Sequence, residues 1–80
     1  MKDIRPHTTI DVTDFVAPIS LLKVENRLAE MTTGQILEVL CADRETKTDL
    51  IDIMRNSNHR CVAVQENSDH FRLLIEKRNT

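Results

Sequence analysis

The spacing of hydrophobic and polar residues changes several times along the chain, and these changes predict six elements of secondary structure. Apolar residues alternate with polar ones in some stretches, which is typical of strands, and recur every three or four positions in others, which is typical of helices. The predicted strands cover residues 8–12, 36–41, 61–64 and 71–76, and the predicted helices cover 18–31 and 46–55. The order is therefore β-α-β-α-β-β.

Proline and a capping pattern suggest where the two helices begin. Pro18 suits the first position of a helix, because its missing N–H would be unpaired there in any case. Thr46 and Asp49 resemble a capping box, which predicts that the second helix starts at Thr46. The apolar stripe expected on the first helix consists of Leu21, Leu22, Val24, Leu28, Ala29 and Met31.

This element order predicts a two-layer α/β (α+β) sandwich. Two crossover helices followed by a hairpin imply a four-stranded mixed sheet with both helices on one face. Eighty residues are enough for one domain. We expect that domain at 8–78, with a loose leader at 1–7 and a tail at 79–80.

Composition and charge exclude several classes of function. The chain lacks Trp and Tyr, has two Phe and carries a formal net charge of −2, so neither stacking platforms nor a basic surface favour nucleic-acid binding. No apolar run approaches the roughly 20 residues that cross a bilayer, and the N-terminus lacks a secretory signal. The expected location is the cytoplasm, with no membrane contact.

The residues that could bind a metal are scattered. Cys41 and Cys61 form no C-x-x-C motif and have no metal-ligand spacing with His7, His59 or His70. We therefore expect two reduced thiols, no metal and no cofactor.

The residues around the first loop resemble the start of a known family. The segment Ile10–Ser20 reads I-D-V-T-D-F-V-A-P-I-S. It is similar to the L-D-x-x-G-x-x-C-P-x-P motif of the TusA/SirA/YeeD sulfur-carrier family. The aspartate and the first proline match, whereas Asp14, Ala17 and Ser20 stand where that family has glycine, cysteine and a second proline.

Further segments extend the resemblance over about Thr8 to Arg78. Thr33–Val39 is similar to the family's P-G-E-x-L-x-V segment, and Asn58-His59 to its G-H pair. Ala42-Asp43, followed by Asp49, is similar to its D-D-P and D-I segments. The ordered set implies the family's fold, which is the two-layer sandwich expected above.

The resemblance implies a chemistry that this chain lacks at the motif position. In the family, a cysteine at a helix N-terminus accepts sulfur and passes it on, and the helix dipole favours its thiolate. The methyl group of Ala17 cannot form a persulfide. We therefore predict a non-catalytic protein that binds or regulates another protein, such as one of a sulfur-transfer pathway, through Asp14, Ala17, Pro18 and Ser20.

Two alternatives remain open. Cys41 or Cys61 could accept sulfur in place of the motif cysteine, because both lie near predicted strand ends, although buried cysteines usually only pack. A small open sheet could also assemble into dimers through a strand edge or a helix. The sequence predicts neither the partner nor the oligomeric state.

Overall fold

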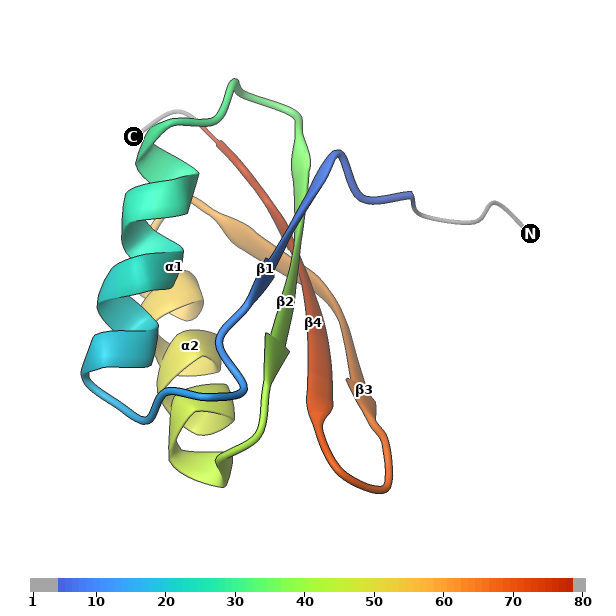
Figure 1. The fold of residues 1–80 in the computed structure, drawn as a ribbon. Helices are drawn as coiled ribbons and strands as arrows, with labels where there is room; N and C mark the ends of the chain where they lie inside the picture. Colours follow the sequence, from blue (N-terminus) through green and yellow to red (C-terminus); the bar gives the residue numbers. More distant parts are fainter. Residues whose placement is uncertain (1–4, 79–80) are drawn as a thin grey trace.

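A computed structural model describes residues 5–78 and contains the six expected elements (Figure 1). They are β1 (Thr8–Asp11), α1 (Ile19–Ala29), β2 (Ile36–Cys41), α2 (Arg44–Arg55), β3 (Arg60–Glu66) and β4 (Phe71–Glu76). Residues 1–4 of the expected leader and the whole expected tail lie outside the described residues. Within the expected leader, His7 makes two hydrogen bonds to Ile36.

The four strands form one mixed sheet in the order β1-β2-β4-β3. β1 runs parallel to β2, and β4 is antiparallel to both β2 and β3. The hairpin therefore inserts β4 between the two strands that precede it in the sequence. Both helices lie on one face of the sheet (Figure 1), so the expected two-layer architecture is confirmed.

The core lies between this face and the helices. Its fully buried residues come from alternate positions of β2 and β4 and from one stripe on each helix, as the sequence pattern predicts. The main members are Val12, Val24, Leu28, Leu37, Val39, Cys41, Leu50, Met54, Leu73 and Ile75. Leu74 is also buried, although its register position between Glu38 and Ala63 is on the helix-free face.

Helix α1 differs from its predicted stripe in a way that matters for function. Val24 and Leu28 are buried as expected, but Leu22 is 55% exposed and Ala29 is also exposed. The helix follows a turn in which Pro18 is the N-cap residue, and that turn rotates Ile19 and Leu22 away from the core. The helix therefore presents apolar side chains to solvent near its N-terminus.

The predicted capping box of α2 is wrong. The helix begins two residues earlier, because the Asp43 carboxylate caps it by accepting a hydrogen bond from the Thr46 backbone N–H at 3.1 Å. This frees the Thr46 hydroxyl, which lies 2.6 Å from the Ser20 hydroxyl of α1. Both side chains are fully buried, so this hydroxyl pair joins the first turns of the two helices.

The two outer edges of the sheet differ from regular strand edges. On β1, the Arg27 guanidinium donates to the Thr8 hydroxyl at 2.9 Å and to the Thr9 carbonyl at 3.3 Å. On β3, the pairing register with β4 shifts between Cys61 and Ala63, which marks a bulge.

The buried hydroxyl pair gives the first prediction. Ser20→Ala should lower the free energy of unfolding by about 1–3 kcal/mol, because it leaves the buried Thr46 hydroxyl without a partner. Adding Thr46→Val should cost less than the sum of the two single substitutions, since both polar groups are then absent. Chemical denaturation of the four proteins measures this coupling.

The control for this cycle is Thr48→Val, an exposed position on the same helix. It should change stability by no more than about 0.5 kcal/mol. Strict additivity of Ser20→Ala and Thr46→Val would show that the two hydroxyls do not interact.

Candidate functional site

The loop between β1 and α1 is held in place at its first residues. Val12 is fully buried and donates its N–H to the Leu40 carbonyl at 2.8 Å. The Asp11 carboxylate accepts hydrogen bonds from the Thr13 hydroxyl at 2.6 Å and the Thr13 N–H at 2.9 Å. These bonds, with the nearby His70, lower the pKa of Asp11. The loop is thus anchored to the end of the sheet before it reaches Ala17.

Beyond this anchor, the chain exposes five apolar residues within eight sequence positions. Val16 is 64% exposed, Leu22 55%, Ile19 50% and Phe15 38%, and Pro18 between them is also exposed. We call these five residues the motif-loop patch. Scattered apolar residues are common on protein surfaces, but a group this dense within eight positions is typical of an interaction site.

Ala17 lies half-buried at the centre of this segment, joined to Pro18 by a cis peptide bond. Pro18 makes no side-chain cap on α1, and the first turn contains no acidic residue. No side chain therefore caps the start of α1, where the helix dipole favours an anion, although the Ser20 N–H already donates to the Val16 carbonyl at 3.1 Å. The methyl group of Ala17 leaves that setting without a nucleophile.

The four residues expected to bind a partner do not all reach the surface. Asp14 and Pro18 are exposed and Ala17 is half-buried, so these three can be reached from solvent. Ser20 is fully buried in its hydrogen bond with Thr46. Its expected role in direct contact does not fit this position, and it instead fixes α1 against α2.

The sequence pattern alone does not point to Phe15, Val16, Ile19 and Leu22 as site residues. A signal was present, because Phe15 and Val16 are large apolar residues in a predicted loop. Leu22 was assigned to the buried stripe instead, since its spacing fits either face of the helix. The direction in which α1 leaves the loop decides whether Leu22 lies on the buried or the exposed face of the helix.

The two thiols lie in different surroundings. Cys41, at the end of β2, is fully buried, and burial together with the charge of Asp43 raises its pKa to about 11. Cys61 on β3 is half-buried, and burial raises its pKa as well. Cys61 also lines a pocket of about 330 Å³ with Met54 and His59, so it is the more accessible of the two.

The histidines take part in local hydrogen bonds. His59 Nδ1 accepts from the Arg78 backbone N–H at 3.1 Å, and burial, with the charge of Lys77, lowers its pKa. His70 lies 2.8 Å from the Asp69 carboxylate and 3.1 Å from the Asn67 amide. Among residues 5–78, no three His, Cys, Asp or Glu side chains are placed to hold a metal ion.

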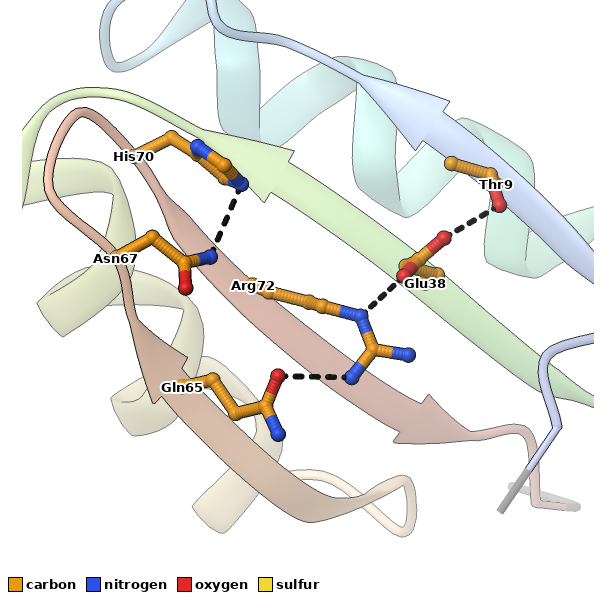
Figure 2. Close-up of polar contacts among 6 residues, drawn as sticks. All are labelled: Thr9, Glu38, Gln65, Asn67, His70 and Arg72. Carbon is orange, nitrogen blue, oxygen red and sulfur yellow. Dashed lines mark hydrogen bonds and ion pairs between the residues drawn. The ribbon is translucent and has the colours of Figure 1, made fainter. Parts of the chain in front are cut away.

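A polar network crosses the helix-free face of the sheet (Figure 2). Glu38 on β2 forms an ion pair with Arg72 on β4 and accepts from the Thr9 hydroxyl on β1 at 2.8 Å. Arg72 also donates to Gln65 on β3 at 3.1 Å. The hydrogen bond from Arg72 lowers the pKa of Glu38. Since these groups satisfy one another across all four strands, the network stabilises the sheet and is not a vacant binding site.

Comparison with solved structures gives the class of fold. A SirA-like protein from Desulfitobacterium hafniense superposes with a TM-score of 0.76 over 90% of this chain and 99% of that one, at 19% sequence identity. At this identity the similarity defines the fold, a SirA-like two-layer sandwich.

The family follows from the sequence as a whole. The model of the family described as sulfurtransferase TusA matches residues 8–77, and the chain belongs to that family. In the part of the chain that the structure describes, no helix is long and apolar enough to cross a membrane.

Three relatives illustrate the range of the similarity. A protein of Archaeoglobus fulgidus named "Putative sulfur carrier protein" is 24% identical over 85% of this chain and 93% of its own length. A protein of Neisseria meningitidis serogroup A with a similar name is 29% identical over 85% and 92%. An uncharacterized protein of Methanocaldococcus jannaschii is 28% identical over 94% of this chain, which spans only 27% of that relative.

The ion pair of the network gives a prediction about acid stability. Because the folded-state pKa of Glu38 lies below its unfolded value near 4.5, its contribution is present above pH 4.5 and is lost as the pH falls through the folded pKa. Glu38→Gln should cost about 1–3 kcal/mol at pH 7 and progressively less below pH 4.5. Denaturation at several pH values measures the difference.

The matched control is Glu25→Gln, an exposed carboxylate of α1 without an ion pair among the described residues. It should change stability at pH 7 by less than about 0.5 kcal/mol. A Glu38→Gln penalty that stays constant down to pH 2 would contradict the assignment to the carboxylate charge.

The thiol environments predict an order of reactivity. In the native protein at pH 7, Cys61 should react slowly with a disulfide reagent and Cys41 more slowly still, because both pKa values are raised and Cys41 is buried. Both rates should rise with pH. Absorbance kinetics of Cys41→Ser and Cys61→Ser separate the two thiols, and denaturant should make them react alike. Fast modification of Cys41 at pH 7 in the folded protein would contradict this placement.

Proposed function

We propose that this member of the TusA family is a protein-binding module without sulfur-carrier chemistry of its own, and that it docks on its partner through the motif-loop patch. The observation that carries this proposal is the exposure of Val16, Ile19 and Leu22 around a position occupied by Ala17. In the family, this position bears the sulfur that a partner must approach. A chain that lacks the sulfur but exposes apolar side chains there has a surface suited to contact and no group to transfer.

Burial of these apolar side chains against a partner would lower the free energy of the complex. Apolar area removed from water contributes about 25 cal/mol per Å², and the four exposed side chains of the patch are large. The anchored loop and the Ser20–Thr46 pair hold these side chains in a fixed arrangement, which lowers the entropy lost on association. Family membership supports a partner from sulfur transfer, where the protein would act as a regulator or competitor.

The names of the relatives support the competing proposal that the chain carries sulfur on another thiol. A persulfide would form when a thiolate attacks the terminal sulfur of a donor persulfide and the donor thiolate leaves. Cys61 is the better candidate, since it is half-buried and lines a pocket, whereas Cys41 is fully buried. The raised pKa of both thiols opposes this reaction at neutral pH.

A sulfur-loading experiment separates the two proposals. The protein is incubated with a cysteine desulfurase and cysteine, and its intact mass is measured before and after reduction. We expect no reducible gain for the natural chain and a gain of one sulfur atom for Ala17→Cys, whose thiol would sit at the uncapped N-terminus of α1. Loading of the natural chain that disappears in Cys61→Ser would establish the carrier proposal instead.

The docking surface is tested by affinity capture from a lysate of the source organism. Ile19→Glu/Leu22→Glu should remove the partner that the natural chain retains, because charges in the patch would be buried unpaired in the complex. Val64→Glu is the matched control, since Val64 is 43% exposed on β3, away from the loop. Equal loss in both variants, or retention in the patch variant, would refute the patch as the binding site.

A further inference from the structure

Charged residues are segregated between the two ends of the molecule. The loops after β1, β2 and β3, together with the first turn of α2, meet at one end (Figure 1), which also carries the motif-loop patch. The acidic residues of this end are Asp11, Asp14, Asp43, Glu45, Glu66 and Asp69, and its Lys and Arg residues are Lys23, Arg44 and Lys47. At the opposite end, the described residues have the reverse excess: Arg5, Arg55, Arg60, Lys77 and Arg78 against Glu30 and Glu76.

The few cations of the acidic end are already engaged. Arg44 forms an ion pair with Glu66 at 3.4 Å and lies over the Phe71 ring, and Lys47 lies over the same ring at 5.1 Å. Lys23, on the flank of the patch, lies 4.5 Å from the centre of the Phe15 ring. Of the six carboxylates, only Glu66 and Asp69 make an ion pair among the described residues, with Arg44 and His70.

Two exposed carboxylates at the acidic end have no ion-pair partner among the described residues. Asp14 directly precedes Phe15 and is exposed. Glu45 is exposed beside Thr46, whose hydroxyl contacts Ser20, the neighbour of Ile19. Asp14 therefore adjoins the patch along the loop, and Glu45 lies in the first turn of α2 at the same end of the molecule.

Helix capping explains only part of this acidity. Asp43 is the N-cap of α2 and Glu45 lies in its first turn, where the helix dipole favours negative charge. Asp14, by contrast, belongs to no helix or strand and makes no ion pair within the described residues. Exposed carboxylates beside exposed apolar groups are what a partner of opposite charge would recognise.

We propose that the partner of the motif-loop patch is a protein whose docking surface carries Lys or Arg residues around an apolar centre. This proposal rests on the docking function proposed above and adds the chemistry of the partner. Opposite charges at the rim of an apolar contact speed encounter and exclude acidic competitors, while the apolar centre supplies affinity.

Two synthetic amphipathic helical peptides with the same leucine stripe, one flanked by lysines and the other by glutamates, test this proposal. Binding is followed by amide chemical shifts of the 15N-labelled chain. The lysine-flanked peptide should shift residues 14–22 and bind at least about tenfold more tightly than the glutamate-flanked one. Its affinity should fall as NaCl rises from about 50 to about 500 mM.

Charge reversal provides the variant. Asp14→Lys/Glu45→Lys should invert the preference between the two peptides. Glu30→Lys/Asp52→Lys, which changes the same charge at exposed positions away from the patch, should retain it. A lysine peptide with a scrambled sequence and no apolar stripe should bind at least about tenfold more weakly, because charge alone gives little affinity at an exposed surface.

Each failure has a distinct meaning. Equal binding of both peptides at residues 14–22 would overturn the basic partner and leave docking through the patch intact. The basic partner would also be overturned if the lysine-flanked peptide shifted other residues or none. Whether the patch binds a protein is decided separately by affinity capture with Ile19→Glu/Leu22→Glu. Salt-sensitive head-to-tail association of the chain, seen by sedimentation, would assign the surface to the basic end of another copy and overturn the proposed partner.

Discussion

The parallel pairing of β1 with β2 is the constraint on which the rest of the structure depends. Parallel neighbouring strands start at the same end of the sheet. After β1 finishes at the opposite end, the chain must therefore return through the helical layer before β2 can begin. This return is α1, and the loop before it must turn sharply at the end of the sheet. The exposed side chains of Phe15, Val16, Ile19 and Leu22 follow from that turn, since α1 cannot bury both its faces against one sheet.

The element order and the layer architecture could be predicted from the sequence, because alternation and helical periodicity are strong at β2, β4 and both helices. The position of β4 between β2 and β3 could not be predicted. Its sign in the structure is that Leu74, on the second face of β4, is buried. The start of α2 was missed because Asp43 and Thr46 are both capping residues, and only the buried contact with Ser20 decides which one caps. Of the candidate site, Ala17 and Pro18 were found by resemblance, whereas the exposed side chains required the orientation of α1.

The loss of the family's thiol and the acidity of its surroundings are consistent with each other. A thiolate or persulfide at position 17 would benefit from the uncapped N-terminus of α1 but would face Asp14 in the same loop. With a methyl group at this position there is no anion to repel, and carboxylates can accumulate around the loop without harm to catalysis. Burial raises the pKa of both remaining thiols, which opposes their ionisation at neutral pH.

The structure of the two edge strands affects how this small domain behaves at high concentration. An open sheet exposes unpaired N–H and C=O groups that can template another chain, and such growth leads to fibrils. Here Arg27 donates to the Thr9 carbonyl on β1, and the register shift between Cys61 and Ala63 makes β3 irregular as a template. Both features are of the kind by which natural sheets oppose the addition of a further strand at their edges.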